Sequence, residues 1–324
     1  VVEATAPKQR TLGAGASYST NFGAGGNVFW EHRNAFGGGE RARVELSGTE
    51  VEQALTGSFR KPLQRPGAVI DYQMELAHED NEAFESTSAT IGFAYDRPFW
   101  RDNRLSTGVE VEAAEITDPT GKVRSLLLST PVELYRNTFD DRLNPTRGLQ
   151  VSVSAAPHAG DGGLYFGLFE ATAAQHHSLR EDGRLVASGW SRLGFTLGPD
   201  TFDLPATKRF YAGGAGSVRG FGYRLAGPLD EDGDPLGGRS VWEAGGEMRM
   251  RVRDSYGVVA FLEGGAAFDA AYPDFQTEPL IGAGVGARYY TAVGPIRFDV
   301  AFPINRRDGV DDAFQIYISI GQAF

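Results

Sequence analysis

The chain has 324 residues, a net charge of −11 and no cysteine. The lack of cysteine excludes a disulfide framework and a thiolate metal site, and the acidic balance excludes the basic surface of a nucleic-acid-binding protein. Glycine is frequent, at 43 residues, and no apolar run approaches the roughly 18 residues that a transmembrane helix needs. If this chain crosses a membrane, strands must cross it.

The first residues lack the features of a secretion signal. The chain opens Val-Val-Glu-Ala-Thr, with no initiator methionine, no basic stretch and no apolar stretch after it. We therefore expect residues 1–9 to be a linker from a region upstream.

Apolar and polar residues alternate with a period of two in many short segments, which is typical of strands. Residues 40–47, 68–77, 241–252 and 296–302 each place apolar side chains on one face and polar ones on the other. At the C-terminus one face carries Phe314, Ile316, Ile318, Ile320 and Phe324, and the other carries Gln315, Tyr317, Ser319, Gly321 and Ala323.

Such alternation also fits a soluble β-sandwich with one wet face, but three features favour a membrane barrel. The polar faces carry charges of both signs, as in a water-filled lumen. The apolar faces run about nine to eleven residues, enough to cross a bilayer when tilted. Aromatic residues recur near strand ends, at Tyr95, Phe99, Trp100, Tyr289 and Tyr290.

The alternation predicts sixteen strands, which begin near residues 10, 25, 40, 51, 67, 85, 104, 123, 147, 163, 184, 239, 257, 280, 294 and 314. An even number lets an antiparallel barrel close with both termini on one side and no unpaired edge in the membrane. Pro131 falls inside the strand near 123 and requires a bulge or an unpaired position there. We therefore expect residues 10–324 to form an all-β, sixteen-stranded antiparallel transmembrane barrel.

One connection, after the eleventh strand, is far longer than the others. It holds about forty residues between the strands near 184 and 239, and loops of this length are usually functional. Arg219 lies there among glycines that allow close backbone approach. If the loop folds into the lumen, Arg219 can donate charge-assisted hydrogen bonds to Glu247 and Glu263 on the following strands. The alternative is that both acids only face water.

Catalytic and metal sites are not predicted. The acidic run at residues 230–234 lacks the glycine and glutamate spacing of an EF-hand, since Pro235 and Val241 occupy those positions. The histidines are scattered, and nothing in the spacing of Ser17, Ser19 and His32 indicates a nucleophile with its base. We expect no enzyme activity, no metal and no cofactor.

The segment Val218-Arg219-Gly220-Phe221, followed by acid-bearing strands and a C-terminal aromatic strand, resembles the outer membrane protein 85 superfamily. Members of that superfamily insert or export proteins at the outer membrane. Residues 14–20, 30–34, 58–62, 144–148 and 294–299 carry the same resemblance along nearly the whole chain. Within the superfamily, the most similar branch is the translocation and assembly module.

This resemblance implies a barrel in the outer membrane of a Gram-negative bacterium, preceded by polypeptide-transport-associated (POTRA) domains and surrounded by lipid. It also implies that Arg219 lies inside the barrel, bonded to Glu247 and Glu263. The implied partners are unfolded outer-membrane or autotransporter client strands, and the periplasmic protein TamB, which would dock through the region upstream.

The implied mechanism is a weak junction between the first and last strands, near residues 10–19 and 314–324. We expect Gly13, Gly15 and Gly321 to weaken this junction, because glycine offers no side chain to pack. Tyr317 and Phe324 lie on its other edge. An open junction would let a client strand pair by β-augmentation. The alternatives are a diffusion porin and a two-partner secretion transporter of the same superfamily.

Overall fold

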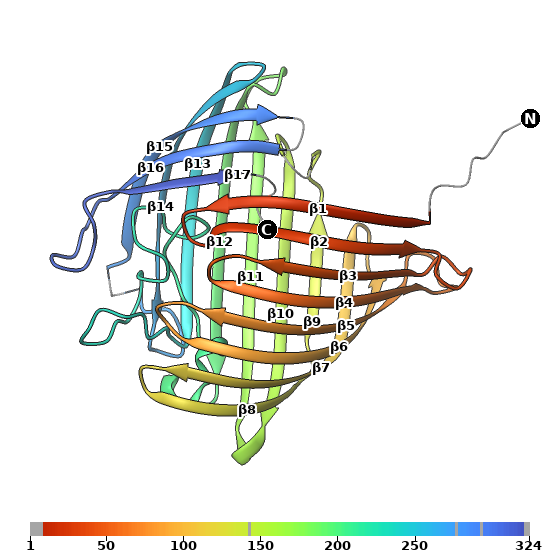
Figure 1. Ribbon diagram of the computed structural model, residues 1–324. Coiled ribbons are helices and arrows are strands. Elements are labelled where there is room, and N and C mark those ends of the chain that lie inside the picture. The colour runs from red at the N-terminus through yellow and green to blue at the C-terminus, as the bar shows by residue number, and fades with distance from the viewer. Residues whose placement is uncertain (1–8, 142–143, 276–277, 292–293, 321–324) are drawn as a thin grey trace, which may run out of the picture.

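The computed structural model describes residues 9–141, 144–275, 278–291 and 294–320. Each strand there pairs antiparallel with its neighbours, and the last returns to the first, so the sheet closes into a barrel (Figure 1). Three short 3₁₀-helices, η1 (Asp161–Gly163), η2 (Thr201–Asp203) and η3 (Ala206–Lys208), lie between strands. No helix in these ranges is long and apolar enough to cross a membrane.

The strands of the described residues are β1 (Arg10–Ser19), β2 (Gly23–Arg33), β3 (Arg41–Gly48), β4 (Glu52–Pro62), β5 (Val69–Asp80), β6 (Glu85–Pro98), β7 (Asn103–Asp118), β8 (Gly121–Ser129), β9 (Val132–Asn137), β10 (Gly148–Gly160), β11 (Tyr165–Ser178), β12 (Leu185–Leu197), β13 (Ser240–Arg253), β14 (Tyr256–Phe268), β15 (Leu280–Thr291), β16 (Gly294–Pro303) and β17 (Gln315–Ile320).

Strands β8 and β9 occupy one position in the barrel, because both pair with β7 on one side and β10 on the other. Sixteen positions therefore close the wall, as the sequence predicts. The break falls at Pro131, whose nitrogen has no hydrogen to donate to a neighbouring strand. The Pro131 carbonyl still accepts a bond from the Gly108 N–H at 2.9 Å, and the Thr130 N–H donates to Pro157 at 3.1 Å. The sequence predicts a bulge or an unpaired position here, and the structure has the second, with Thr130 and Pro131 lying between β8 and β9.

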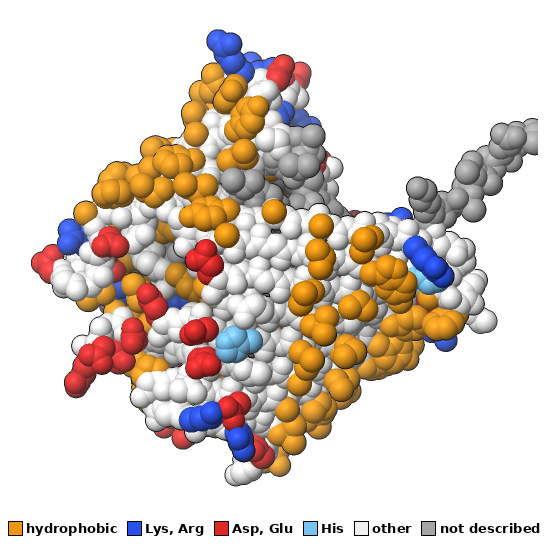
Figure 2. Space-filling view, in the orientation of Figure 1, with side chains coloured by type: hydrophobic (Ala, Val, Ile, Leu, Met, Phe, Trp, Pro, Cys, Tyr) orange, Lys and Arg blue, Asp and Glu red, His pale blue; other side chains and the backbone are white. Residues whose placement is uncertain are grey.

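The predicted alternation places apolar side chains on the outside of the wall. Val44, Met74 and Ile91 are exposed, while polar neighbours in the same strands point inward. Figure 2 shows hydrophobic side chains gathered in a broad band over the strands at the front, with acidic side chains concentrated near the loops at the left. A closed wall with an apolar exterior satisfies the backbone hydrogen bonds that hydrocarbon cannot supply.

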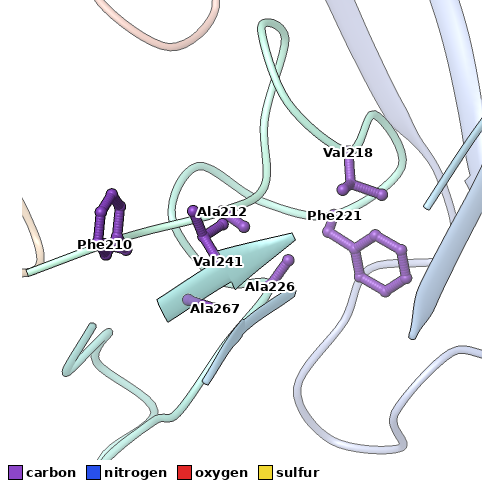
Figure 3. Packing of buried hydrophobic residues seen from close by; sticks show 7 residues of the cluster. All are labelled: Phe210, Ala212, Val218, Phe221, Ala226, Val241 and Ala267. Atoms are coloured by element: carbon purple, nitrogen blue, oxygen red, sulfur yellow. The ribbon is translucent and has the colours of Figure 1, made fainter. Parts of the chain in front are cut away.

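The connection between β12 and β13, residues 198–239, is hereafter the long loop. Its base is closed by the antiparallel bridge between Phe210 and Gly238. Figure 3 shows the apolar cluster it forms with the wall, which consists of Phe210, Ala212, Val218, Phe221 and Ala226 from the loop, Val241 from β13 and Ala267 from β14. Val218 and Phe221 are completely buried. Burial of such side chains contributes roughly 1.5–3 kcal/mol each, so the loop is a packed element.

Candidate functional site

Arg219 of the long loop is bound most closely by Glu263 of β14. Its Nε donates to both carboxylate oxygens at 3.0 Å, its Nη2 donates to Oε1 at 2.5 Å, and its backbone N–H donates to Oε2 at 2.9 Å. The next residue back along β14, Leu262, is 55% exposed on the outer face. Because successive side chains of a strand point to opposite faces, Glu263 and its partner Arg219 lie on the inner face of the wall.

Two further acids complete this group. Arg219 Nη1 donates to Asp299 of β16 at 2.9 Å, and Nη2 donates to Glu247 of β13 at 3.3 Å. The structure thus brings both predicted acids to Arg219 and adds Asp299, which the sequence reasoning missed. The signal for Asp299 was present in the alternation of β16, where it faces away from Phe298. We call Arg219 with Glu247, Glu263 and Asp299 the clamp.

The clamp is largely buried and nearly balanced in charge. Glu263 and Asp299 are buried, and the guanidinium carbon of Arg219 lies 3.4 Å from the centre of the Phe261 ring. Arg288 of β15 shares the same acids, with bonds to Asp299 and a 3.7 Å approach to Glu247. Two guanidinium groups therefore neutralise most of the charge of three carboxylates. Removing one partner would leave buried charge unpaired, which is strongly unfavourable.

Close approach of the loop to the wall depends on two glycines. Gly220 has a positive φ of 107°, and a Cβ there would lie 3.0 Å from the backbone of Phe302. A Cβ on Gly282 of β15 would lie only 1.7 Å from the Arg219 carbonyl oxygen. Any larger residue at position 282 must push the loop backbone away, because neither atom belongs to a flexible side chain.

The same loop is tied to the opposite side of the barrel. Arg209 pairs with Asp118 of β7 at 2.8 Å, and Arg224 pairs with Glu79 of β5 at 2.8 Å. Arg224 also lies 4.8 Å from the centre of the Phe84 ring. The long loop therefore spans the interior from β5 and β7 to β13–β16. A cavity of about 800 Å³ remains beside the clamp.

The junction between β1 and β17, hereafter the seam, is short within the described residues. Only Tyr18 with Ile320 and Ser19 with Ser319 are paired, whereas β16 and β17 share five pairs. The predicted seam residues Gly321 and Phe324 lie outside the described residues. The prediction that the whole seam is the weakest pairing of the barrel therefore stays a prediction.

Gly13 and Gly15 do not leave the gaps that the sequence predicts for them. A Cβ on Gly13 would coincide with the Phe29 ring, and one on Gly15 with the Asn27 side chain, both from β2. The guanidinium carbon of Arg43 lies 3.7 Å from the centre of the Phe29 ring. These side chains fill the space of the missing Cβ atoms, an arrangement that supports glycine in strands. The glycines therefore pack β1 against β2.

Tyr317 has a different place from the one predicted. It pairs with Asp299 of β16, two residues before the described seam pairs, and its side chain is buried inside the barrel. The Gly220 N–H donates to the Tyr317 hydroxyl at 3.0 Å, and that hydroxyl donates to the Phe221 carbonyl at 2.9 Å. Tyr317 is therefore a contact between the last strand and the long loop.

A closed antiparallel barrel with an apolar exterior and an inward-folded, clamped loop defines a class of outer-membrane protein. The chain belongs to the Omp85 superfamily, because the profile of the Omp85 superfamily domain matches residues 34–324. Family and fold together identify a protein of the Gram-negative outer membrane.

Sequence relatives include two proteins named outer membrane protein assembly factor BamA. The one from Nitratidesulfovibrio vulgaris is 26% identical and aligns with 98% of this chain and 42% of its own length. The one from Neisseria meningitidis serogroup B is 23% identical, with 90% and 44% aligned. The chain thus spans less than half the length of these relatives.

Solved structures share the fold. BamA from Haemophilus ducreyi lacking POTRA domains 1–3 superposes with a TM-score of 0.85 at 17% identity, over 98% of this chain and 70% of that one. CdiB from Acinetobacter baumannii gives a TM-score of 0.69 at 12% identity, over 98% and 60%. These relatives are named as assembly factors or as CdiB, and the narrower resemblance to TamA, the barrel of the translocation and assembly module, is not supported by them.

Proposed function

We propose that this barrel assembles proteins into the outer membrane by opening the seam between β1 and β17 to a client strand. Unpaired backbone groups on an opened edge would form hydrogen bonds with an extended client segment, as in β-augmentation. The reaction makes and breaks backbone hydrogen bonds only. Family membership supports this function, since the BamA relatives are named as outer membrane protein assembly factors.

The observation that carries the proposal is the match of the Omp85 superfamily domain to residues 34–324. The pairing of β17 within the described residues adds to it. This strand shares five described pairs with β16 and two with β1. Each lost pair removes backbone hydrogen bonds whose net contribution is about 1 kcal/mol apiece. Within the described residues, β17 is therefore joined to β16 by more of these bonds than to β1.

A disulfide across the seam tests the proposal. The chain contains no native cysteine, and Ser19 lies opposite Ser319, so the Ser19→Cys/Ser319→Cys variant can be cross-linked without competing thiols. We expect the oxidised barrel to remain folded and heat-modifiable but to lose client assembly in reconstituted vesicles, and reductant to restore it. The matched control is Ala77→Cys/Ser88→Cys, which locks the paired strands β5 and β6. Full client assembly by the oxidised seam variant would refute lateral opening.

The same cross-linking experiment also tests two alternative functions. A diffusion porin is disfavoured by the match of the Omp85 superfamily domain to residues 34–324, and it would conduct ions equally well with the seam locked. A two-partner secretion transporter is favoured by the CdiB structures, although their TM-scores are lower than that of BamA. Such a transporter would export one soluble partner through the lumen, and locking the seam would not block it.

A narrower form of the proposal assigns autotransporter clients and TamB as the periplasmic partner. It rests on the sequence resemblance alone, because the relatives described above are BamA proteins. Assembly of a porin and assembly of an autotransporter barrel, compared in the same vesicles, distinguish the general proposal from the narrower one. Preference for the autotransporter, together with capture of TamB by the full-length protein, would support the narrower form.

A further inference from the structure

The hydroxyl of Tyr317 connects two parts of the molecule that are far apart in sequence. It accepts a bond from Gly220 and donates one to Phe221, so both of its hydrogen-bonding roles are used by the long loop. The ring packs with Val259, Phe261 and Ala301 on the inner face of the wall. Tyr317 is 6% exposed, so water does not replace these partners.

The backbone that Tyr317 contacts is held on both sides. Arg219, directly before Gly220, is fixed in the clamp, and Phe221 is completely buried in the loop cluster. Residues 220 and 221 therefore cannot move without breaking the clamp or exposing Phe221. A strand that bonds to this backbone is attached to the most firmly held part of the loop.

Tyr317 is also close to the seam along β17. Ser319, two residues further on and on the same face, pairs with Ser19 of β1. In the described residues, no hydrogen bond or ion pair joins the side chains of β1 itself to the long loop. The turn after β1 meets the long loop through an edge-to-face contact of Phe22 with Tyr223, whose ring centres are 5.4 Å apart. The long loop therefore holds the β17 edge by buried hydrogen bonds, and it meets the β1 edge through this ring contact at the turn.

We propose that Tyr317 is a positioning residue that couples the long loop to the last strand, so that release of the loop and opening of the seam occur together. While the loop is clamped, the hydroxyl holds β17 in the curvature that lets Ser319 and Ile320 reach β1. When the two hydrogen bonds break, the end of β17 is held by β16 alone. The consequence for client assembly rests on the proposed function, whereas the coupling itself is a property of the empty barrel.

The coupling is tested by amide hydrogen exchange in the purified, client-free barrel. Tyr317→Phe keeps the ring and removes both hydrogen bonds. We expect exchange in β1 and β17 to accelerate roughly tenfold, the equivalent of about 1–2 kcal/mol, while β5 and β6 keep their protection. The matched control is Tyr289→Phe, whose ring is on the outer face of β15 and 42% exposed. It should leave exchange in all four strands unchanged.

A double-mutant cycle distinguishes coupling from a general loss of stability. Arg219→Ala releases the loop, so Tyr317→Phe added to it should increase exchange at the seam little further, giving a non-additive pair. Additive effects, acceleration in all strands alike, or no acceleration in β1 and β17 would each overturn the coupling. If Tyr317→Phe does not fold, Arg219→Ala alone should still accelerate exchange in β17 more than in β5. Equal acceleration in the two strands would also overturn the coupling.

The outcomes also separate this inference from the proposed function. Normal assembly of clients by the cross-linked Ser19→Cys/Ser319→Cys barrel would refute lateral opening and leave the exchange result intact. Conversely, a seam-dependent assembly reaction with unchanged exchange in Tyr317→Phe would retain the function and remove Tyr317 from it.

Discussion

The two edges of the seam are supported in different ways. The β17 edge is attached to the long loop through Tyr317, and the loop is clamped to β13, β14 and β16 through Arg219. The β1 edge is supported by β2, whose Phe29 and Asn27 side chains cover Gly13 and Gly15. One edge is therefore held to the packed interior by buried hydrogen bonds and ion pairs, and the other meets the interior at its turn, where Phe22 contacts Tyr223.

This difference indicates which side moves. Opening on the β17 side requires buried ion pairs and a buried hydroxyl to lose their partners, whereas opening on the β1 side requires separation of cross-strand pairs and of the Phe22–Tyr223 ring contact. Buried charges left unpaired cost several kcal/mol, and cross-strand contacts contribute about 0.2–1 kcal/mol each. The comparison therefore predicts that release of the loop is the costlier part of opening, and that β1 and β2 move away from β17 as a unit when it occurs.

Gly282→Ala should have the largest effect, because it removes the support of the β17 edge altogether. The added Cβ would lie 1.7 Å from the Arg219 carbonyl oxygen, so the loop backbone must move. We expect destabilisation of at least about 3 kcal/mol and rapid proteolysis of the long loop. Heat-modifiability on gels and limited proteolysis measure both. Gly92→Ala is the control, since a Cβ there meets no atom closer than 3.8 Å.

Arg219→Ala should follow, with a loss of about 3 kcal/mol in the free energy of unfolding, because Glu263 and Asp299 remain buried without a full partner. Arg219→Lys should recover little of this, since an ammonium cannot bond to three carboxylates in the fork geometry of a guanidinium. Denaturant unfolding in detergent measures the change. The exposed Arg253→Ala, on the same strand as Glu247, is the control and should be close to wild type.

Phe29→Ala tests the support of the β1 edge. It removes the ring over Gly13 and the Arg43 contact, which together contribute about 1–2 kcal/mol. Hydrogen exchange in β1 should accelerate while proteolysis of the long loop stays unchanged. Val28→Ala, on the outer face and 51% exposed, should alter neither. Release of the loop by Phe29→Ala would show that the two edges are not supported independently.

The smallest effect is expected at the connection between β9 and β10. Partial burial raises the pKa of Asp140, but hydrogen bonds from Thr146, Arg147 and Asp141 outweigh it and hold that pKa well below its usual range. A lowered pKa stabilises the folded turn above the unfolded value of about 4, and this is lost as the pH falls further. Pepsin cleavage of the turn should therefore increase between about pH 4 and pH 2, without a change at the seam.

Asp140→Asn is the direct check on that turn. The amide does not titrate, so cleavage should lose its dependence on pH over the same interval. Asp308→Asn, in the exposed connection between β16 and β17, is the control and should retain the wild-type profile. Equal pH profiles for wild type and Asp140→Asn would show that the Asp140 carboxylate does not cause the pH dependence of cleavage.

The wall was predictable because its rules are local. Side chains alternate every two residues along a strand, so apolar periodicity identified the strands, and the even number of positions followed from closure. The boundaries of β1 agree with the predicted Arg10 to Ser19. Even the interruption at Pro131 had a local cause, because proline requires a bulge or an unpaired position in a strand, and the closed wall decided that β8 and β9 are separate strands.

The site was predictable only where its partners lie close in sequence. Glu247 and Glu263 are on the two strands directly after the loop, so the inward face of each could be worked out from the alternation. Asp299 lies 80 positions from Arg219. Only the curvature of the closed wall brings β16 to the same point as β13 and β14.

The sequence by itself determined a sixteen-position barrel with an apolar exterior, a charged interior and one loop with an arginine that requires acids. Tertiary structure decided that Gly13 and Gly15 are packed by β2, that Gly282 must be small, and that Tyr317 binds the loop. These outcomes depend on which side chains meet across the lumen once sixteen strands have closed. Spacing along one chain does not contain that information, because register, curvature and loop path are fixed only together.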